Sequence, residues 1–398
     1  MIGTGIAQGL PLIISPFLTR LYSEHDFALF TTFSSIVSIL VVGVGGRYHF
    51  AIVLPQKESD SVKLFLLSIY ITLAYSFLLL IGCVIIDLLI QQPLSLAIYL
   101  IPLYVCFYGL WICISFRSIR DKTFLHNATA KVVQSVVYII AGVGLGFMRL
   151  TLFGLITARI LGVISSGLYL HMVNFKFSYF VKLKDLKEVA LKYIDYPKYG
   201  LAPAFLDIAS VQGIILIMTW FYSTSDVGFL GLTTLVLSAP ISLIGGSFKD
   251  VFYQKMVSLF NTRSYRQAKS LFIKSAFGLF LLGIPICLVI YFFGPEAFTF
   301  VFGEKWQRSG EFASIICLSF LLQLVVSPLS SIFNAANKLK IASYWQTLYF
   351  LTTFISLGIS SFILRLTVDE LLVVYVVHEL VLYSIYFSLQ YWTLKRLT

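Results

Sequence analysis

The sequence consists of twelve apolar runs separated by short polar stretches, and this pattern restricts the fold more than any other feature. Most runs reach about 18 residues or more, enough for a helix to cross the roughly 30 Å of hydrocarbon in a bilayer. Only 12% of the residues are charged, against about 25% in soluble proteins. The sequence therefore predicts an all-α polytopic membrane protein rather than a soluble enzyme. The runs cover residues 2–19, 27–54, 64–86, 94–116, 131–148, 151–174, 199–221, 227–247, 271–294, 311–333, 342–364 and 370–392.

The polar connections divide these twelve transmembrane helices into two halves. The longest connection, from Lys176 to Lys198, holds six of the 29 lysine and arginine residues. We therefore predict an N-terminal six-helix bundle (residues 1–176), a cytoplasmic linker (residues 177–198) and a C-terminal six-helix bundle (residues 199–398). The first run lacks the basic segment and the A-x-A site of a signal peptide, so we interpret it as the first spanning helix.

The distribution of positive charge predicts the orientation. If the N-terminus is cytoplasmic, the cytoplasmic loops and the C-terminus carry 22 of the 29 lysines and arginines. The opposite side carries five, namely Arg20, Arg149, Lys305, Arg308 and Arg365. An excess of positive charge marks the cytoplasmic side, so both termini are expected there.

An internal repeat relates the two halves. Residues 21–46 align without gaps with residues 221–246, at a constant offset of 200. Because each half has an even number of helices, the repeat predicts a pseudo-two-fold axis along the membrane normal and a central cavity near the midplane, an arrangement that favours alternating access. The identical positions are Tyr22 and Tyr222, Ser23 and Ser223, Asp26 and Asp226, Ser38 and Ser238, Gly45 and Gly245, and Gly46 and Gly246.

Other motifs give no indication of a cofactor. The five cysteines lie inside apolar runs and form no C-x-x-C pair. The glycine clusters at Gly43 and Gly142 lack the strand-then-helix context of a nucleotide loop, and close helix packing explains them better. The net charge of +11 fits basic loops that face anionic headgroups. We therefore expect no cofactor, no metal and no nucleic-acid partner.

Five ionisable residues inside the apolar runs are candidates for a functional site: Arg47, Arg159, Asp207, His378 and Glu379. Arg159, Asp207 and Glu379 lie about 12 Å inside their helices and Arg47 about 10 Å. An arginine at the bilayer centre costs at least about 2.5–3.5 kcal/mol. These groups are therefore expected to face protein or water rather than lipid.

Structural roles are open alternatives for the same residues. Arg47 can reach the cytoplasmic headgroups or pair with a carbonyl freed by the glycines. Arg159 can pair with Asp207 or Glu379, in which case the carboxylates are partners rather than proton carriers. His378 and Glu379 point about 100° apart on a helix, so at most one of them need line a cavity. The turn at residues 22–26 is explained by a helix cap.

Five segments follow one another over nearly the whole chain: "SPFLTRLYSEHDFALF" from Ser15, "RYHFAIVLP" from Arg47, "YPKYGLAPAFLD" from Tyr196, "SAPISLIGGSFKDVFYQK" from Ser238 and "FGEKWQRSGEFA" from Phe302. In this order they resemble the landmarks of Wzx-type O-antigen and exopolysaccharide flippases, polysaccharide biosynthesis proteins of the multidrug/oligosaccharidyl-lipid/polysaccharide exporter superfamily. One departure is that "RYHF" has His49 and Phe50 where an acidic and a small apolar residue are common, so no role of that acid is carried over.

The resemblance implies a flippase for an undecaprenyl-pyrophosphate-linked oligosaccharide, such as the repeat unit of lipopolysaccharide O-antigen, in the bacterial inner membrane. Arginine offers a planar fork to phosphate oxygens, so we expect Arg47 to receive the pyrophosphate near the cytoplasmic side and Arg159 to form a second station. Gly43, Gly45 and Gly46 are expected to let the substrate or a neighbouring helix approach closely. The expected partners are this substrate, membrane lipids, a polysaccharide polymerase and a chain-length regulator.

Energy is expected from an ion gradient or from consumption of the product, since the sequence has no nucleotide-binding motif. Asp207 or Glu379 is the candidate that exchanges a proton or a monovalent cation, because removal from water favours a protonated carboxylate. A drug or cation antiporter of the same superfamily is the alternative, which an excess of acidic residues in the cavity would support. A glycosyl-polymerising or ligating enzyme is a third class, but the longest outward stretch, residues 295–311, is short for a catalytic loop.

Overall fold

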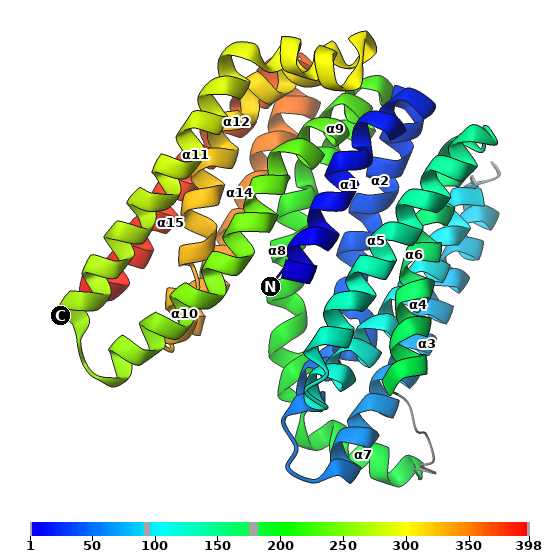
Figure 1. The fold of residues 1–398 in the computed structure, drawn as a ribbon, viewed down its shortest axis with the longest axis vertical. Coiled ribbons are helices and arrows are strands. Elements are labelled where there is room, and N and C mark those ends of the chain that lie inside the picture. Colours follow the sequence, from blue (N-terminus) through cyan, green and yellow to red (C-terminus); the bar gives the residue numbers. More distant parts are fainter. Residues whose placement is uncertain (1, 91–95, 175–181, 396–398) are drawn as a thin grey trace. The chain divides into compact units, whose positions relative to one another are not determined.

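The computed structural model describes residues 2–90, 96–174 and 182–395. These residues form helices joined by short turns, with no strand among them (Figure 1). Within them, 11 helical segments are long and apolar enough to cross a membrane, and the apolar helix Gly9–Leu21 is shorter. The predicted all-α polytopic membrane fold is therefore confirmed. The two-fold relation between six-helix halves and the central cavity stay predictions.

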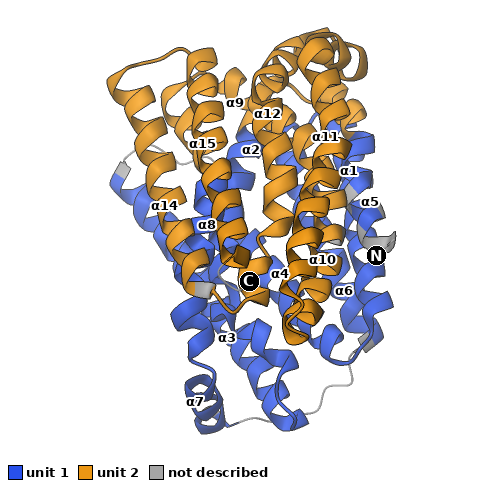
Figure 2. Ribbon diagram, turned by 90° about the vertical axis from the view of Figure 1, so that its left-hand side faces the viewer, with its two compact units in different colours: residues 1–14, 29–212 blue, residues 15–28, 213–398 orange. Residues whose placement is uncertain are grey.

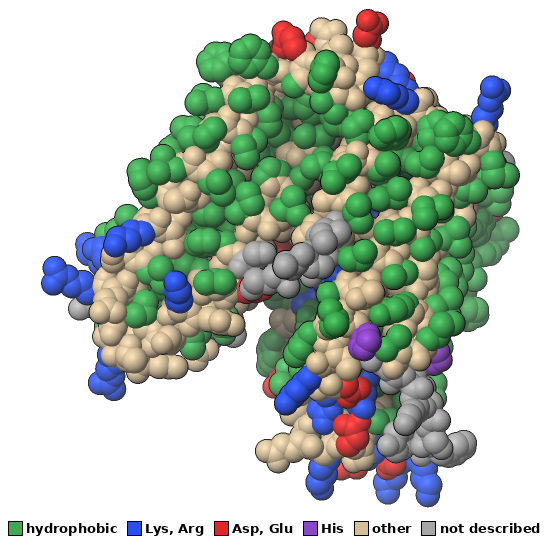
Figure 3. All heavy atoms as spheres, viewed as in Figure 1, with side chains coloured by type: hydrophobic (Ala, Val, Ile, Leu, Met, Phe, Trp, Pro, Cys, Tyr) green, Lys and Arg blue, Asp and Glu red, His purple; other side chains and the backbone are tan. Residues whose placement is uncertain are grey.

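The outer surface of the helices is apolar, as a lipid environment requires. Large hydrophobic side chains such as Leu88 and Phe300 are 75% and 88% exposed. Hydrophobic side chains cover much of the face shown in Figure 3. Soluble monomers rarely expose continuous apolar patches of this extent, because such surface is unfavourable in water. The chain is a multi-pass membrane protein.

The chain forms two compact units, shown in Figure 2. Unit 1 comprises residues 1–14 and 29–212, and unit 2 comprises residues 15–28 and 213–398. These limits describe packing and differ from the boundaries 1–176, 177–198 and 199–398, which stay a prediction about the repeat. Part of the predicted linker lies outside the described residues. Its remainder forms α7 (Leu183–Lys192) and the start of α8 (Asp195–Phe221).

Unit 1 contains the start of α1, most of α2, a 3₁₀ segment named η1, α3 to α7 and the first part of α8. Helices α3, α4 and α6 lie side by side in Figure 1, and α4 packs against both α3 and α6. The bounds are α1 Ile2–Leu21, α2 Glu24–Leu40, η1 Val41–Val53, α3 Glu58–Ile90, α4 Leu96–Arg120, α5 Phe124–Phe147 and α6 Thr151–Asn174.

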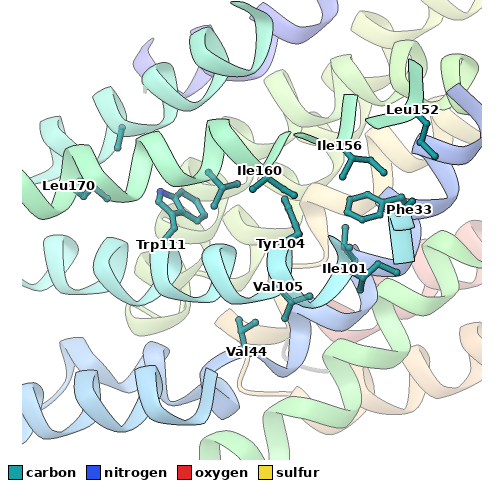
Figure 4. Packing of buried hydrophobic residues seen from close by; sticks show 14 residues of the cluster. Phe33, Val44, Ile101, Tyr104, Val105, Trp111, Leu152, Ile156, Ile160 and Leu170 are labelled. Carbon is teal, nitrogen blue, oxygen red and sulfur yellow. The ribbon is translucent and has the colours of Figure 1, made fainter. Parts of the chain in front are cut away.

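A buried hydrophobic cluster of unit 1 lies mainly between α4 and α6, with further residues from α2, η1 and α5 (Figure 4). Val105 of α4 and Leu170 of α6 are completely buried in it. Tyr104 points from α4 toward α6 in this core. Burial of these side chains fixes α4 and α6, and with them the polar groups that lie on the same helices.

Unit 2 contains the end of α1, the start of α2, the end of α8 and all later helices. Residues 295–311, expected as an outward stretch, are almost entirely helical, since they form the end of α11, η3 and the start of α12. The bounds are α9 Thr224–Pro240, η2 Ile241–Gly245, α10 Gly246–Asn261, α11 Tyr265–Phe302, η3 Glu304–Trp306, α12 Gln307–Leu329, α13 Ile332–Ala335, α14 Leu339–Gly358, η4 Ile359–Ile363 and α15 Val368–Lys395.

Residues 15–28 belong to unit 2 because η3 holds them. The completely buried Trp306 donates from Nε1 to the carbonyl of Thr19 at 3.2 Å and packs edge-on against Phe27, with ring centroids 4.9 Å apart. Lys305 donates from Nζ to the carbonyl of Tyr22 at 2.9 Å. An indole nitrogen buried in this way needs an acceptor, and the end of α1 supplies it.

The predicted cap at residues 22–26 is confirmed and recurs in the repeat. The Ser23 hydroxyl accepts the backbone N–H of Asp26 at 3.1 Å, and the Asp26 carboxylate accepts the N–H of Ser23 at 3.0 Å. In the second repeat the Ser223 hydroxyl accepts the N–H of Asp226 at 3.2 Å. Each cap satisfies donors that the first turn of a helix leaves free.

Candidate functional site

The second spanning segment is broken at the glycine-rich sequence that precedes Arg47. Val44 has an extended backbone (φ −59°, ψ 139°), and Gly45, Gly46 and Arg47 have left-handed conformations with φ of 57°, 53° and 64°. Glycine adopts this conformation readily, whereas a residue with a Cβ does so at a cost. The chain is thus redirected inside a membrane segment, between Leu40 and Tyr48.

Side chains of α3 satisfy the backbone at this break. The N–H of Gly45 donates to Thr72 Oγ1 at 3.0 Å, and the Tyr75 hydroxyl donates to the carbonyl of Leu40 at 3.1 Å. The Tyr75 ring lies so close to Gly43 that a Cβ there would be 2.9 Å from a ring carbon. Inside a bilayer no water replaces these partners, so α3 makes the break possible.

Arg47 has a left-handed backbone conformation inside a membrane-spanning segment. The other described non-glycine residues with positive φ lie in turns or at helix ends, whereas Arg47 lies inside the spanning segment Glu24–Val53. A left-handed conformation costs a residue with a Cβ roughly 1–2 kcal/mol. Strain of this kind is concentrated at functional sites, so the backbone marks Arg47 independently of its charge.

The Arg47 side chain is half-buried and has no carboxylate partner among the described residues. Its guanidinium carbon lies 4.5 Å from the centre of the Phe50 ring. Its Nε is buried without a hydrogen-bond partner, beside Gly200 of α8, where a Cβ would be 3.6 Å away. The freed carbonyl of Leu40 is bound by Tyr75 and not by Arg47. Arg47 therefore presents an uncompensated positive charge.

The segment after Arg47 is fixed to α7. The Tyr48 hydroxyl donates to the carbonyl of Ala190 at 3.0 Å, and Tyr48 is buried with Ile52 and Val189 in a second core cluster. His49 is buried against the rings of Phe50 and Phe116. Aromatic packing thus fixes the part of the chain that follows Arg47.

Arg159 of α6 is surrounded by hydroxyls and aromatic rings. Its Nε donates to the Tyr104 hydroxyl at 3.3 Å, and Nη1 donates to Ser34 Oγ. Its guanidinium carbon lies 5.2 Å from the Tyr104 ring centre and 5.7 Å from that of Phe30. Neutral partners of this kind orient a guanidinium without neutralising its charge.

The two arginines lie in the same unit, but their contacts come from different residues. Phe50 and Gly200 adjoin Arg47, whereas Ser34, Phe30 and Tyr104 adjoin Arg159. Sequence reasoning did not find Ser34, Tyr104 or Gly200. Two weak signals existed, since Ser34 lies in the repeat and Gly200 lies in the quoted segment "YPKYGLAPAFLD".

The carboxylate candidates lie in different units. Asp207 is exposed on α8 in unit 1. Glu379 of α15 in unit 2 is 1% exposed, and the Tyr349 hydroxyl lies 3.0 Å and 2.9 Å from its two carboxylate oxygens. His378 Nδ1 lies 3.2 Å from Glu379 Oε1, and its Nε2 lies 3.1 Å from Thr352 Oγ1. The two neighbours on α15 thus meet despite their separation around the helix.

No metal cluster occurs in the described part of the chain, where no three histidine, cysteine, aspartate or glutamate side chains come together. The five cysteines are free thiols. The chemistry available at these positions is therefore recognition by cations, hydroxyls and aromatic rings in unit 1, and exchange at a buried carboxylate in unit 2.

Comparison with known proteins gives a matching sequence family and solved structures of similar fold. The family model described as "Polysaccharide biosynthesis protein" matches residues 17–311. No curated protein matches the chain. Two solved structures with similar folds are a multidrug resistance MATE family transporter of the MOP superfamily in an inward-facing conformation and the lipid II flippase MurJ in an inward closed conformation.

These likenesses in fold extend over nearly the full length. The MATE transporter has a TM-score of 0.77 at 13% identity, with 98% of this chain and 95% of that chain covered. MurJ has a TM-score of 0.74 at 14% identity, with 97% and 87% covered. A MOP superfamily transporter from Pyrococcus furiosus, for which a binding pocket of reverse polarity is described, has a TM-score of 0.66 at 13% identity, with 100% and 94% covered.

Proposed function

This chain belongs to the family of polysaccharide biosynthesis proteins, and from that premise we propose that it is a flippase for undecaprenyl-pyrophosphate-linked oligosaccharides. In this proposal it moves an O-antigen or exopolysaccharide repeat unit from the cytoplasmic to the periplasmic leaflet of a bacterial inner membrane. A sugar cannot cross hydrocarbon unaided, because each hydroxyl that loses its hydrogen bonds costs kilocalories. The fold of this chain is similar to that of membrane transporters and of a lipid flippase, which supports the proposal of a flippase.

The uncompensated guanidinium of Arg47 is the observation that supports the proposal most strongly. A charge in a membrane segment is expensive and is retained where it serves a function. The break brings this charge onto a left-handed backbone, and its Nε has no hydrogen-bond partner among the described residues. A diphosphate is the ligand that such a group recognises best, since its oxygens match the planar fork of arginine.

Arg159 extends the same chemistry as a second station for the diphosphate. Tyr104 and Ser34 keep its guanidinium oriented while leaving the charge available. Tyrosine hydroxyls and ring faces also suit the mixed polar and apolar surface of a sugar. We propose that the headgroup contacts Arg47 first and Arg159 later during alternating access, with Gly43, Gly45 and Gly46 allowing the break.

A reconstituted system tests the flippase directly. The purified protein is inserted into liposomes that contain a fluorescent polyprenyl-diphosphate-linked disaccharide in both leaflets, and a membrane-impermeant quencher reports the accessible fraction. The wild type is expected to make nearly all of the probe accessible with time, and Arg47→Ala to lose this activity. Arg20→Ala is the matched control, because it removes an exposed cation at the end of α1. If correctly folded wild type leaves the inner-leaflet probe protected from the quencher, the proposal is contradicted.

Ion exchange is the second part of the proposed mechanism. Two carboxylates are candidates for binding and releasing a proton or a monovalent cation. Glu379 is buried beside the Tyr349 hydroxyl and His378, and Asp207 is exposed on α8. The same liposomes, measured over a range of imposed pH and sodium gradients, compare wild type with Asp207→Asn and Glu379→Gln. At least one variant is expected to lose gradient-driven acceleration. Unaltered transport in both variants under every gradient removes this part.

The buried carboxylate in unit 2 also favours a second candidate, an antiporter for cationic drugs. Glu379 with the rings of Tyr349, Trp345 and Tyr386 forms a set of groups that can bind an organic cation. Efflux of a lipophilic cationic dye from proton-loaded liposomes distinguishes the candidates. Dye efflux without flipping of the sugar lipid would replace the flippase by the antiporter.

A further inference from the structure

A pocket between α10 and α11 in unit 2 lies apart from every residue considered above. It has a volume of about 400 Å³, and Leu259 and Leu271 are its apolar lining residues. Lys255 on α10 and Lys274 on α11 line it, and the remaining lining residues are Ser258, Gln267 and Ser270. The lining positions recur at intervals of three and four residues, so one face of each helix contributes to the pocket.

The two helices are held together behind the pocket by a buried cluster. Phe252 and Met256 of α10 and Ala268 and Phe272 of α11 are buried in this cluster. The pocket residues Leu259 and Leu271 pack against it. The pocket is therefore built on a packed helix pair and not on a loop. Such a scaffold holds Lys255 and Lys274 on facing helices.

Neither lysine is neutralised. Among the described residues, Lys255 and Lys274 have no ion pair and no hydrogen bond, and both side chains are exposed. More positive charge surrounds them, because lysine and arginine side chains gather at this end of α10 and α11 (Figure 3). Arg263, Arg266 and Lys269 lie in or beside the turn between the two helices.

The corresponding end of unit 1 is organised differently. There Glu58 pairs with Arg117 and Arg120, and Asp60 pairs with Lys63 and Lys192. Carboxylates of the protein thus neutralise these four cations of unit 1. The cations of the α10–α11 pocket lack such partners, so an external anion can take that place.

The surface beyond the pocket is apolar, which narrows the class of ligand. On the face of α11 that bears Lys274, the next turns carry Phe277 and Leu281, which are 61% and 52% exposed. Nothing lies within 4 Å of a Cβ built at Gly278, so this strip is open. Helix α11 is interrupted at Phe293. The part before this break, residues 265–292, is about 42 Å long and exceeds the roughly 30 Å of hydrocarbon, so one of its ends reaches the headgroup region. The first turns are that end, because they carry Arg266, Lys269 and Lys274. The exposed apolar strip of Phe277 and Leu281 lies next to the basic pocket, so a ligand with both an anionic group and an acyl chain can contact both.

We propose that the pocket between α10 and α11 binds the phosphate headgroup of an anionic phospholipid of the bilayer. Lys255 and Lys274 contact the phosphate, Ser258, Gln267 and Ser270 bind the glycerol and headgroup hydroxyls, and the acyl chain lies along Phe277 and Leu281. Basic pockets between spanning helices bind anionic headgroups on the cytoplasmic side, which is the side predicted for this turn. The ligand is a lipid of the surrounding membrane and not the transported substrate.

The test measures binding of dioleoylphosphatidylglycerol to the purified full-length protein in detergent by native mass spectrometry. The variant Lys255→Gln/Lys274→Gln is expected to bind the lipid at least about tenfold more weakly, since each basic residue near a headgroup contributes appreciably to binding. The control Lys184→Gln/Lys187→Gln removes two exposed lysines of α7 and alters the net charge equally. It is expected to bind like wild type. All four substitutions are at exposed positions, and circular dichroism checks the folding of each protein.

Four outcomes would overturn the proposal. Unchanged binding by the pocket variant excludes the two lysines, and an equal loss in the control reduces the effect to general surface charge. Displacement of the lipid by sn-glycerol 1-phosphate at a similar concentration identifies a site for small phosphates. A fourth arm uses farnesyl diphosphate. If it binds more tightly than the phospholipid and depends on the same lysines, the pocket belongs to the transported substrate instead.

Discussion

The two glycine pairs of the internal repeat adopt different structures at equivalent positions. Gly45 and Gly46 have φ of 57° and 53° and break the second spanning segment. Gly245 and Gly246 have φ of −61° and −63°, and the chain passes through the five-residue π-helix η2 directly into α10. Identical residues at an offset of 200 thus permit a break in one unit and a continuous helix in the other.

The difference arises from what surrounds each pair. In unit 1, Tyr75 of α3 binds the carbonyl of Leu40 before the break, and Thr72 binds the N–H of Gly45 within it. Arg47 follows the glycines. In unit 2, the backbone at the second pair is helical and meets its own hydrogen bonds, so no outside partner is needed. A glycine pair makes a left-handed conformation inexpensive, and the packed neighbour decides whether the chain adopts it. Within residues 2–90, 96–174 and 182–395, only unit 1 therefore places a strained cation in a spanning segment.

Alanine substitution is expected to give the largest difference in stability between the two glycine pairs. Gly45→Ala should reduce the free energy of unfolding by about 2 kcal/mol. The backbone at Gly45 is left-handed, which disfavours alanine, and the added Cβ would lie 3.1 Å from His49 Nδ1. Gly246→Ala should be neutral or stabilise by about 0.5–1 kcal/mol, since it is helical and a Cβ there meets nothing within 4 Å. Denaturant unfolding in detergent measures both. Equal effects would mean that the break is not a property of unit 1.

Removal of the partner on α3 is expected to have the next largest effect. Thr72→Val leaves the N–H of Gly45 without its acceptor in a buried site and should cost about 1.5 kcal/mol. The same substitution at the exposed Thr347, whose hydroxyl binds only the carbonyl of Ser343 on its own helix, should change stability little. The same unfolding assay compares them. A Thr72→Val protein as stable as the control would show that α3 does not support the break.

The two equivalent caps are expected to show the smallest difference. Ser23→Ala should cost about 1 kcal/mol, because the cap bonds of Ser23 are partly buried and held under η3. Ser223→Ala should cost about 0.5 kcal/mol, because the bonds of Ser223 are exposed. Hydrogen exchange of the first turns of α2 and α9 reports the local effect. A larger effect of the substitution at Ser223 than at Ser23 would contradict the view that burial makes the first cap contribute more to stability.

The sequence was sufficient for the features that depend on local pattern. Apolar runs predicted the spanning helices because their length must match the bilayer, and the serine and aspartate at positions 22–26 predicted a cap that the structure contains. The arginines could be singled out because charge is rare in such runs. The helical nature of residues 295–311 was not predicted, because Pro295 and the charged residues after it interrupt the apolar run. In the structure Phe298, Phe302 and Trp306 of this stretch are buried.

The contacts of the candidate site depend on residues that are distant in the sequence. Arg159 reaches Ser34, 125 positions away, and Tyr104, 55 positions away. Pattern reasoning cannot pair such residues, because every spanning helix contains hydroxyls at similar spacing. For the same reason the left-handed conformation of Arg47 could not be foreseen, since it depends on Thr72 and Tyr75 of α3.

The most direct test of the central claim is the distribution of lipid-linked oligosaccharide between the two leaflets in cells that lack this protein. Cells are complemented with wild type, with Arg47→Ala or with Arg47→Lys, at equal levels of inserted protein. We predict accumulation confined to the cytoplasmic leaflet, relieved fully by wild type, partly by Arg47→Lys, which keeps the charge without the planar fork, and not by Arg47→Ala. Normal flipping in cells without the protein and without a redundant flippase, or full relief by Arg47→Ala, would contradict the account.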